Sequence, residues 1–455
     1  MLEAVEHYKE AVRLDPDHAQ TWDDYARAAQ DAGRTDEAKG AFEQAALKAR
    51  DSNNPRLRYW ATLGLGDVAL AQGNLSSALR LYQTAAAIAD PEVKADPSDT
   101  GWQRDLSASY TRVGDVLVAQ GNLAEALKAF RDSLAIADRL AKADPSNAGW
   151  QRDLSVSNER LGDIHLAQGD LAAALKEYRA SLDRMVPFRD RDPSNTDLQR
   201  FTSVTHDKIG DVLVAQGNLA EALKAFHDSL AIRDRLTKAD PGHAGWQRGL
   251  SVSYNKVGDV LVAQGNLAEA LKVFRDSLAI RDRLAKTDPG NAGWQRDLSV
   301  SYAKVGEVLV AQGNLPDALK AFREDLVIAD RLAKADPGHA GWQRDLSVSY
   351  ERMGNVLVAQ GNLPEALKAF RDSLAIADRL AKADPGNAGW QRDLAISHGK
   401  VAGVLARRGD RKGALEAFRR GREILARLKD ASPTDAALRK DLAWFDGQIA
   451  ALEKR

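Results

Sequence analysis

The sequence predicts an all-α fold, a solenoid of about ten stacked antiparallel helix pairs with one pair per repeat. The first observation is a 48-residue segment that recurs along most of the chain. It opens on Gly-Trp-Gln-Arg, with the tryptophan at Trp102, Trp150, Trp246, Trp294, Trp342 and Trp390. Leu198 takes the tryptophan place in the copy that fills the doubled interval. The other observations are helical spacing of apolar residues and turn signals at fixed places within each copy.

Each copy contains two helical patterns, as residues 245–292 show. Apolar residues of the first pattern step by four, four, three and four, which places them on one helix face. They are Trp246, Leu250, Tyr254, Val257 and Leu261. The second pattern consists of Leu267, Leu271, Phe274 and Leu278. Gly265-Asn266 between them predicts a turn, because glycine adopts a left-handed cap conformation without Cβ strain.

Glycines and prolines refine this prediction. Gly258 recurs in the other copies although glycine inside a helix costs about 1 kcal/mol relative to alanine, so we expect two helices to approach closely there. Pro316 and Pro364 belong in a first helical turn and fix where the second helix begins. Pro91 and Pro187 fall inside expected helical runs, where each should end the helix early or kink it.

Residues 19–50 place aromatic and small residues at the spacings of a known signature. These residues are Trp22, Tyr25, Ala26, Gly33, Ala38, Phe42 and Ala45. The segment resembles the tetratricopeptide repeat family, and the resemblance continues in the 48-residue copies through Gly258, Gly265, Ala270 and Phe274. The copies exceed the family's 34-residue norm and are similar in style to kinesin-light-chain and bacterial signalling arrays. The resemblance implies a right-handed superhelix.

The repeat pattern predicts three regions. Residues 1–52 hold an N-terminal half repeat and one 34-residue unit, residues 53–436 hold eight 48-residue units, and residues 437–455 form a C-terminal capping helix. Because the first half of the opening repeat is absent, we expect either a chain cut from a longer protein or a first helix that pairs with another segment. A natural start with a short capping helix is the alternative.

Composition and motifs favour binding over catalysis. The formal net charge is −1, so no overall basic field attracts nucleic acid or acidic membranes. The chain has no cysteine, which excludes disulfides and thiolate chemistry and fits a cytoplasmic, reducing compartment. No HExxH pair, nucleophile elbow or phosphate loop is present. We therefore expect no enzyme activity, no metal and no cofactor, and no membrane span or apolar signal segment.

The repeated Trp-Gln-Arg motif suggests nucleic-acid binding as an alternative function, because aromatic and arginine side chains could stack on successive bases. Trp246 lies on the same stripe as Leu250 and Val257, which favours a core position instead. We expect each tryptophan to anchor its helix against the previous unit, while the arginine stem covers apolar surface.

The family resemblance implies that first helices line a concave surface that binds a partner. Two series of positions would be exposed there, three residues before and one residue after the recurring small residue. The first, here called the variable row, is Thr111, Glu159, Asp207, Asn255, Ala303, Glu351 and Gly399. The second, the acidic row, is Asp115, Asp163, Asp211, Asp259, Glu307, Asn355 and Gly403. Apart from Ala303 and the two glycines, these are the candidate partner-binding residues.

We interpret the chain as a protein-interaction scaffold for a peptide or partner domain, of basic or mixed charge. The alternative function is a sensor or oligomerisation arm of a larger, bacterial signalling protein. A simply solvated face with i,i+3 charge pairs would also produce the two rows. Residues 1–52 carry 7 basic against 12 acidic side chains and residues 399–455 carry 14 against 8. Self-association through these ends is one interpretation, and drift of solvated charges is the other.

Overall fold

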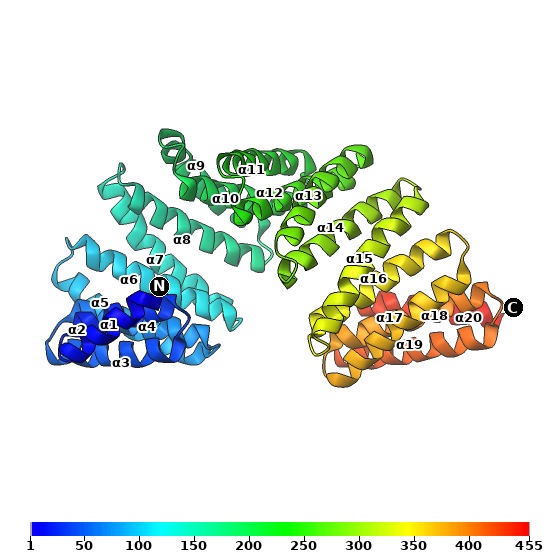
Figure 1. The fold of residues 1–455 in the computed structure, drawn as a ribbon, viewed down its shortest axis with the longest axis horizontal. Coiled ribbons are helices and arrows are strands. Elements are labelled where there is room, and N and C mark those ends of the chain that lie inside the picture. Colours follow the sequence, from blue (N-terminus) through cyan, green and yellow to red (C-terminus); the bar gives the residue numbers. More distant parts are fainter. Residues whose placement is uncertain (1, 455) are drawn as a thin grey trace. The chain divides into compact units, whose positions relative to one another are not determined.

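The structure is a computed structural model that describes residues 2–454. Within that range the chain forms twenty α-helices and no β-strand, which confirms the predicted all-α solenoid class. It divides into two compact units, one ending at Ile232 and the other beginning at Arg233. Each unit is a series of consecutive helices joined by short loops (Figure 1).

The helices of the first unit are α1 (Leu2–Leu14), α2 (Ala19–Asp31), α3 (Thr35–Asp51), α4 (Pro55–Ala71), α5 (Leu75–Ala95), α6 (Thr100–Ala119), α7 (Leu123–Ala143), α8 (Ala148–Ala167), α9 (Leu171–Arg191), α10 (Thr196–Ala215) and the beginning of α11 (Leu219–Ala239). The second unit continues with α12 (Ala244–Ala263), α13 (Leu267–Thr287), α14 (Ala292–Ala311), α15 (Leu315–Ala335), α16 (Ala340–Ala359), α17 (Leu363–Ala383), α18 (Ala388–Arg407), α19 (Arg411–Ala431) and α20 (Ala436–Glu453).

Loop residues set the helix ends. Gly265 has a φ of 79°, as the turn pattern predicted, and allows the chain to reverse between α12 and α13. Between repeats, the side-chain oxygen of Asn291 accepts a hydrogen bond from the Trp294 N–H at 3.1 Å and caps α14. His339 takes the same place before α16, where its Nδ1 accepts from the Trp342 N–H at 3.2 Å.

Prolines behave in two ways. Pro316 and Pro364 lie in the first turns of α15 and α17, as predicted. Of the two effects predicted for Pro91 and Pro187, an early helix end is excluded, since α5 continues to Ala95 and α9 to Arg191, and a kink stays a prediction. A proline removes only one backbone N–H, and the last turn of α9 still closes through a bond from Asp192 N–H to the Phe188 carbonyl at 3.2 Å.

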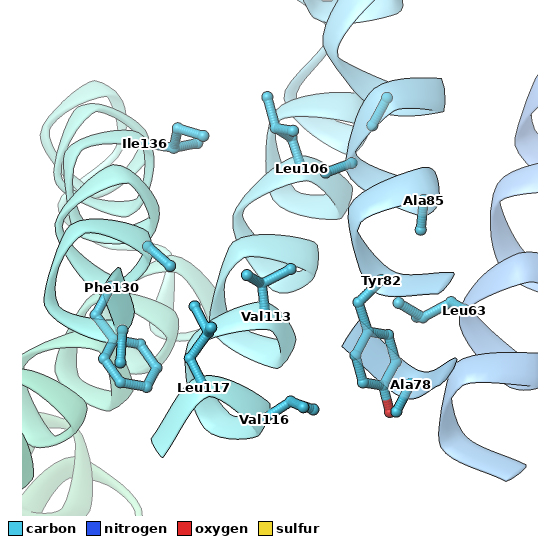
Figure 2. Packing of buried hydrophobic residues seen from close by; sticks show 14 of the residues in the cluster. Leu63, Ala78, Tyr82, Ala85, Leu106, Val113, Val116, Leu117, Phe130 and Ile136 are labelled. Atoms are coloured by element: carbon cyan, nitrogen blue, oxygen red, sulfur yellow. The ribbon is translucent and has the colours of Figure 1, made fainter. Parts of the chain in front are cut away.

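Each unit is held together by apolar layers between successive helices. Figure 2 shows Leu106, Val113 and Leu117 of α6 between Tyr82 of α5 and Phe130 of α7. All five side chains are buried. Within each unit the buried apolar residues form successive clusters between neighbouring helices rather than one central core, as in other repeat proteins.

The recurring tryptophans join successive repeats. Trp342 of α16 packs against the cluster that contains Ile328 and Leu332 of α15, the second helix of the preceding repeat. Trp390 does the same with the cluster that contains Ile376 and Leu380 of α17. These contacts confirm the predicted anchoring role within the second unit.

Close approach at the recurring glycine is also confirmed. A Cβ added to Gly258 of α12 would lie 2.6 Å from Cε1 of Phe274 in α13, and at Gly306 and Gly354 it would lie 2.6 Å from the rings of Phe322 and Phe370. The ring occupies the space that any larger side chain would need.

We predict that Gly258→Leu lowers the free energy of unfolding in urea by about 1–3 kcal/mol, because the added side chain displaces the buried Phe274 ring. Gly403→Ala is the matched control. Gly403 lies in helix α18 with no heavy atom within 4 Å of an added Cβ, so alanine should stabilise the helix by up to about 1 kcal/mol. Equal effects of the two substitutions would contradict the packing role.

Candidate functional site on the first helices

The first helix of each repeat presents one recurring face, here called the first-helix face. In α14 it comprises Arg296, Val300, Lys304, Glu307 and Val310, which follow helical spacing. Equivalent positions recur in the other 48-residue repeats, so side chains of one kind form rows along each unit.

An ion-pair ladder crosses this face between successive first helices. Arg296 Nε of α14 lies 2.5 Å from the Asp345 carboxylate of α16, and Arg344 lies 2.7 Å from Asp393 of α18. The other short rungs are Arg104–Asp153, Arg248–Asp297 and Arg392–Asp441. Each partly exposed pair contributes only about 0–1 kcal/mol. The arginine of the Trp-Gln-Arg motif therefore binds the next repeat instead of serving only as apolar cover.

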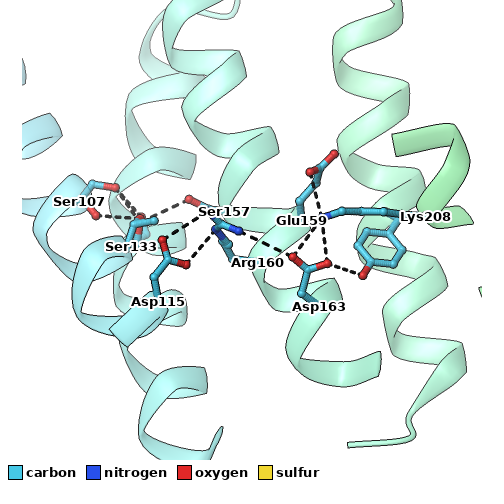
Figure 3. A network of polar contacts seen from close by, with 10 residues as sticks. Ser107, Asp115, Ser133, Ser157, Glu159, Arg160, Asp163 and Lys208 are labelled. Atoms are coloured by element: carbon cyan, nitrogen blue, oxygen red, sulfur yellow. Dashed lines mark hydrogen bonds and ion pairs between the residues drawn. The ribbon is translucent and has the colours of Figure 1, made fainter. Parts of the chain in front are cut away.

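A second ladder neutralises the acidic row. Figure 3 shows Asp115 of α6 paired with Arg160 of α8, and Asp163 of α8 paired with Lys208 of α10. The nearest nitrogen–oxygen distances are 3.1 Å and 2.8 Å. In the second unit the corresponding pairs are Asp259–Lys304 and Glu307–Arg352, while Asn355 accepts a hydrogen bond from Lys400. Asp211 is exposed on α10. The acidic row is thus on the surface but largely charge-compensated.

The variable row is not exposed, and that expectation was wrong. Asp207 and Ala303 are buried, and Thr111, Glu159, Asn255 and Glu351 are half-buried. Three of them, Thr111, Glu159 and Glu351, form hydrogen bonds to neighbouring helices. Thr111 lies 2.9 Å from the Ser133 hydroxyl of α7, and Glu159 accepts from Thr205 of α10.

Glu351 shows what this location does to a carboxylate. It accepts hydrogen bonds from the Ser373 and Ser397 hydroxyls, both at 3.1 Å. Burial raises its pKa, while the two hydroxyls and nearby Lys400 oppose that shift. Glu351 therefore links α16 to α17 and α18 through hydrogen bonds. Variation in the variable row thus changes the contacts between helices rather than the side chains exposed on the surface.

Sequence reasoning missed the buried glutamine of the repeated motif. Gln295 Nε2 donates to the Ala285 carbonyl at 3.0 Å, and Gln343 donates to the Ala333 carbonyl at 2.9 Å. Each satisfies an orphan carbonyl at the end of the preceding helix. Its unvarying recurrence beside the tryptophan was the available signal.

Exposed aliphatic side chains form further rows on the first-helix face. Their exposed fractions lie between 37% and 41%. They are Val118, Leu166, Val204 and Val214 in the first unit and Val262, Val300 and Val310 in the second. Single exposed valines are ordinary, but these recur at two registers of the repeat beside paired charges, so apolar side chains stand at regular intervals on this face.

Crevices open on this face between first helices. In the first unit a cavity of about 430 Å³ between α6 and α8 is lined by Ala108 and Thr111. The equivalent crevice between α16 and α18 is only about 60 Å³, because Val348 and Glu351 fill those places. The smaller side chains at these two positions accompany the larger crevice.

Comparison with known proteins now assigns the family. Sequence profiles described as Tetratricopeptide repeat match residues 2–59, 59–84, 106–145, 201–283 and 347–385, just over half of the chain. The chain belongs to the tetratricopeptide repeat family. This family's fold indicates a protein-interaction scaffold. A search among curated proteins finds no match.

Solved tetratricopeptide repeat structures share the fold at low identity. A signal transduction ATPase with numerous domains from Pyrococcus horikoshii, which has a tetratricopeptide repeat sensor, is 13% identical with a TM-score of 0.55. That match covers 84% of this chain and 50% of the ATPase, so the chain spans half the length of that protein. The apo form of RapI is 11% identical, with a TM-score of 0.52 and coverages of 87% and 97%. A putative kinesin light chain from Podosopora anserina with nearly identical TPR-like repeats is 18% identical, with a TM-score of 0.39 and coverages of 52% and 98%.

Two further features of the described residues bear on function. None of their helices combines the length and apolar character that a membrane crossing requires. Within residues 2–454, no three His, Asp or Glu side chains converge in a metal-binding arrangement.

In the first pair of the arginine ladder the two charged groups lie farther apart than in the other rungs. The carboxylate of this pair leads to a prediction of how stability depends on pH. Arg56 Nε lies 3.8 Å from the Asp105 carboxylate, and its guanidinium stacks 4.5 Å above the Trp102 ring centre. Burial raises the pKa of Asp105 to about 6, against the opposing attraction of Arg56. Since the folded-state pKa exceeds the unfolded value, ionising Asp105 reduces stability as pH rises from about 4 to about 6.

We predict that Asp105→Asn stabilises the chain relative to wild type by roughly 1–3 kcal/mol more at about pH 7 than at about pH 4. Urea unfolding at a series of pH values measures this difference. Asp153→Asn is the control, because it removes the carboxylate from a rung of 2.6 Å and should destabilise the chain at neutral pH. A loss of stability at neutral pH from both substitutions would contradict the role of Asp105 burial.

Proposed function

We propose that this chain is a protein-interaction scaffold that holds an extended peptide or a partner helix against the first-helix face. The observation that supports this best is the alternation of exposed aliphatic rows with charge-compensated ladders on successive first helices. Aliphatic side chains supply contact area, and the ladders supply donors and acceptors without a strong net field.

The charge arrangement favours a partner of mixed charge over a purely basic one. Asp163, Asp259 and Glu307 already have cationic partners. A basic ligand would have to displace Lys208, Lys304 or Arg352, whereas a mixed-charge ligand can add to both members of each pair. The acidic row would thus contribute to recognition, while the variable row holds the helices that present it.

Within this proposal, residues 53–436 supply the repeated binding face, residues 1–52 its N-terminal extension and residues 437–455 its cap. A second candidate function is a sensor or oligomerisation arm of a larger signalling protein. It is supported only by the shared fold of the ATPase with a tetratricopeptide repeat sensor. Self-association through the acidic 1–52 and basic 399–455 ends would suit that role.

We predict that the double substitution Val300→Asp and Val310→Asp weakens partner capture by about tenfold or more, because charges would be buried unpaired against the ligand. The chain, immobilised, is incubated with an extract of its source, and captured proteins are quantified by mass spectrometry against wild type.

Val327→Asp is the matched control, since Val327 is 63% exposed on α15, the second helix of the same repeat. Circular dichroism and urea midpoints confirm folding of both variants. If the control loses the same partners as the double variant, or if neither loses any, the first-helix face is not the binding surface.

A further inference from the structure

The last repeat departs from the pattern and leaves a hollow on the first-helix face. A cavity of about 400 Å³ lies among α16, α18 and α20. Its apolar wall includes Phe418, Trp444 and Phe445. Phe418 and Trp444 meet edge to face, with ring centres 5.8 Å apart. Trp444 lines the hollow and nevertheless remains 50% exposed.

Two glycines create this space. Gly399 and Gly403 of α18 take the places that hold Glu351 and Asn355 in the preceding repeat. A Cβ on Gly399 would lie 2.9 Å from Phe445 and 3.1 Å from Trp444, so Gly399 admits the aromatic residues of α20. A Cβ on Gly403 would have no heavy atom within 4 Å. The space beside Gly403, here called the floor of the hollow, is therefore unfilled, and no contact within the chain requires a glycine there.

The charge of the hollow is positive. Lys400 continues the second ladder, but its partner is the neutral Asn355, whose Oδ1 accepts at 3.0 Å. The Arg407 side chain, also in the lining, is exposed and forms neither an ion pair nor a hydrogen bond among the described residues. Asp441 is engaged by Arg392 at 2.7 Å. Nearby Glu351 is half-buried and hydrogen-bonded to two serines.

We propose that this hollow binds an acidic segment of a partner protein, which inserts one aromatic or branched aliphatic side chain against Trp444 and places a side-chain carboxylate beside Lys400 and Arg407. The proposal deepens the proposed function, on which it rests, because the hollow is the C-terminal end of the first-helix face. It also specifies that the part of the partner bound at that end is acidic.

Size and chemistry select this occupant. The volume lies at the lower end of the ~300–1,000 Å³ range of ligand pockets, which suits one large side chain and its neighbours better than a folded surface. Aromatic anchors in such pockets dominate many interfaces. Lys400 and Arg407, neither of which is paired with a carboxylate of the ladders, provide charge complementarity to acidic residues.

The test uses an end-blocked peptide, acetyl-Gly-Glu-Asp-Phe-Leu-Asp-Glu-Gly-amide, with 4-fluorophenylalanine at the Phe position, titrated with the full chain by fluorine NMR. One comparison peptide replaces the four acids by lysine, and another replaces Phe-Leu by Gly-Gly with the fluorine probe moved to the amide cap. We expect the acidic apolar peptide to bind at least about tenfold more tightly than either comparison peptide.

Gly403→Leu fills the floor of the hollow and should reduce binding by at least about tenfold without lowering the thermal midpoint. Gly447→Leu is the matched control, because Gly447 lies in α20 outside the lining and has equally open space. It should bind as wild type does. Lys400→Glu combined with Arg407→Glu should favour the lysine peptide.

Several results would overturn the proposal. They are absence of acidic-peptide binding to wild type at about 1 mM, equal binding to Gly403→Leu, preference for the lysine peptide, or dependence on a free terminal carboxylate. If sedimentation shows that Gly403→Leu dissolves a self-associated form of the chain, the occupant is a second copy and the proposal fails. The proposed function would still stand in each case if Val300→Asp with Val310→Asp abolishes partner capture.

Discussion

The contact between a first-helix glycine and a second-helix aromatic ring is the constraint on which most of the helix pairs depend. Gly258 and Phe274 illustrate it, since no side chain larger than hydrogen fits between the two helices. That approach sets how the pair packs, and the pair in turn presents the surface on which the next tryptophan packs. Because stability in such stacks is a sum of pair and neighbour terms, this contact contributes once for every pair in which it recurs.

Polar side chains adapt this architecture to a long, partly exposed surface. The recurring arginine forms ladder rungs such as Arg344–Asp393, and the recurring glutamine completes the end of the preceding helix, as Gln343 does. Many charged side chains that composition alone would place unpaired on the surface are therefore engaged in contacts between repeats. In the proposed function, recognition falls to the exposed valines and to places where the repeat is interrupted, above all Gly403 and Trp444.

Residue-level prediction succeeded where one local rule decided the outcome. Gly265 needs a left-handed conformation, Pro316 fits only a first turn, and Gly258 tolerates no Cβ contact, so each position could be interpreted from the chain alone. An early helix end at Pro187, one of its two predicted effects, does not occur, because the surrounding helix continues past a single missing N–H. Prediction also failed for the exposure of Asp207 and Glu351, because helical spacing places a residue on a face without specifying what packs against that face.

By itself, the sequence determined the repeat length, the two helices per repeat, their turns and the close helix approach at the recurring glycine, since all of these follow from spacing within about fifty residues. Only the tertiary structure decided which charges are paired, because partners such as Lys304 and Asp259 lie on different repeats and meet only after stacking. The same holds for the hollow at Gly403. It exists because α20 packs beside a helix that lacks two side chains, and neither segment indicates that cavity alone.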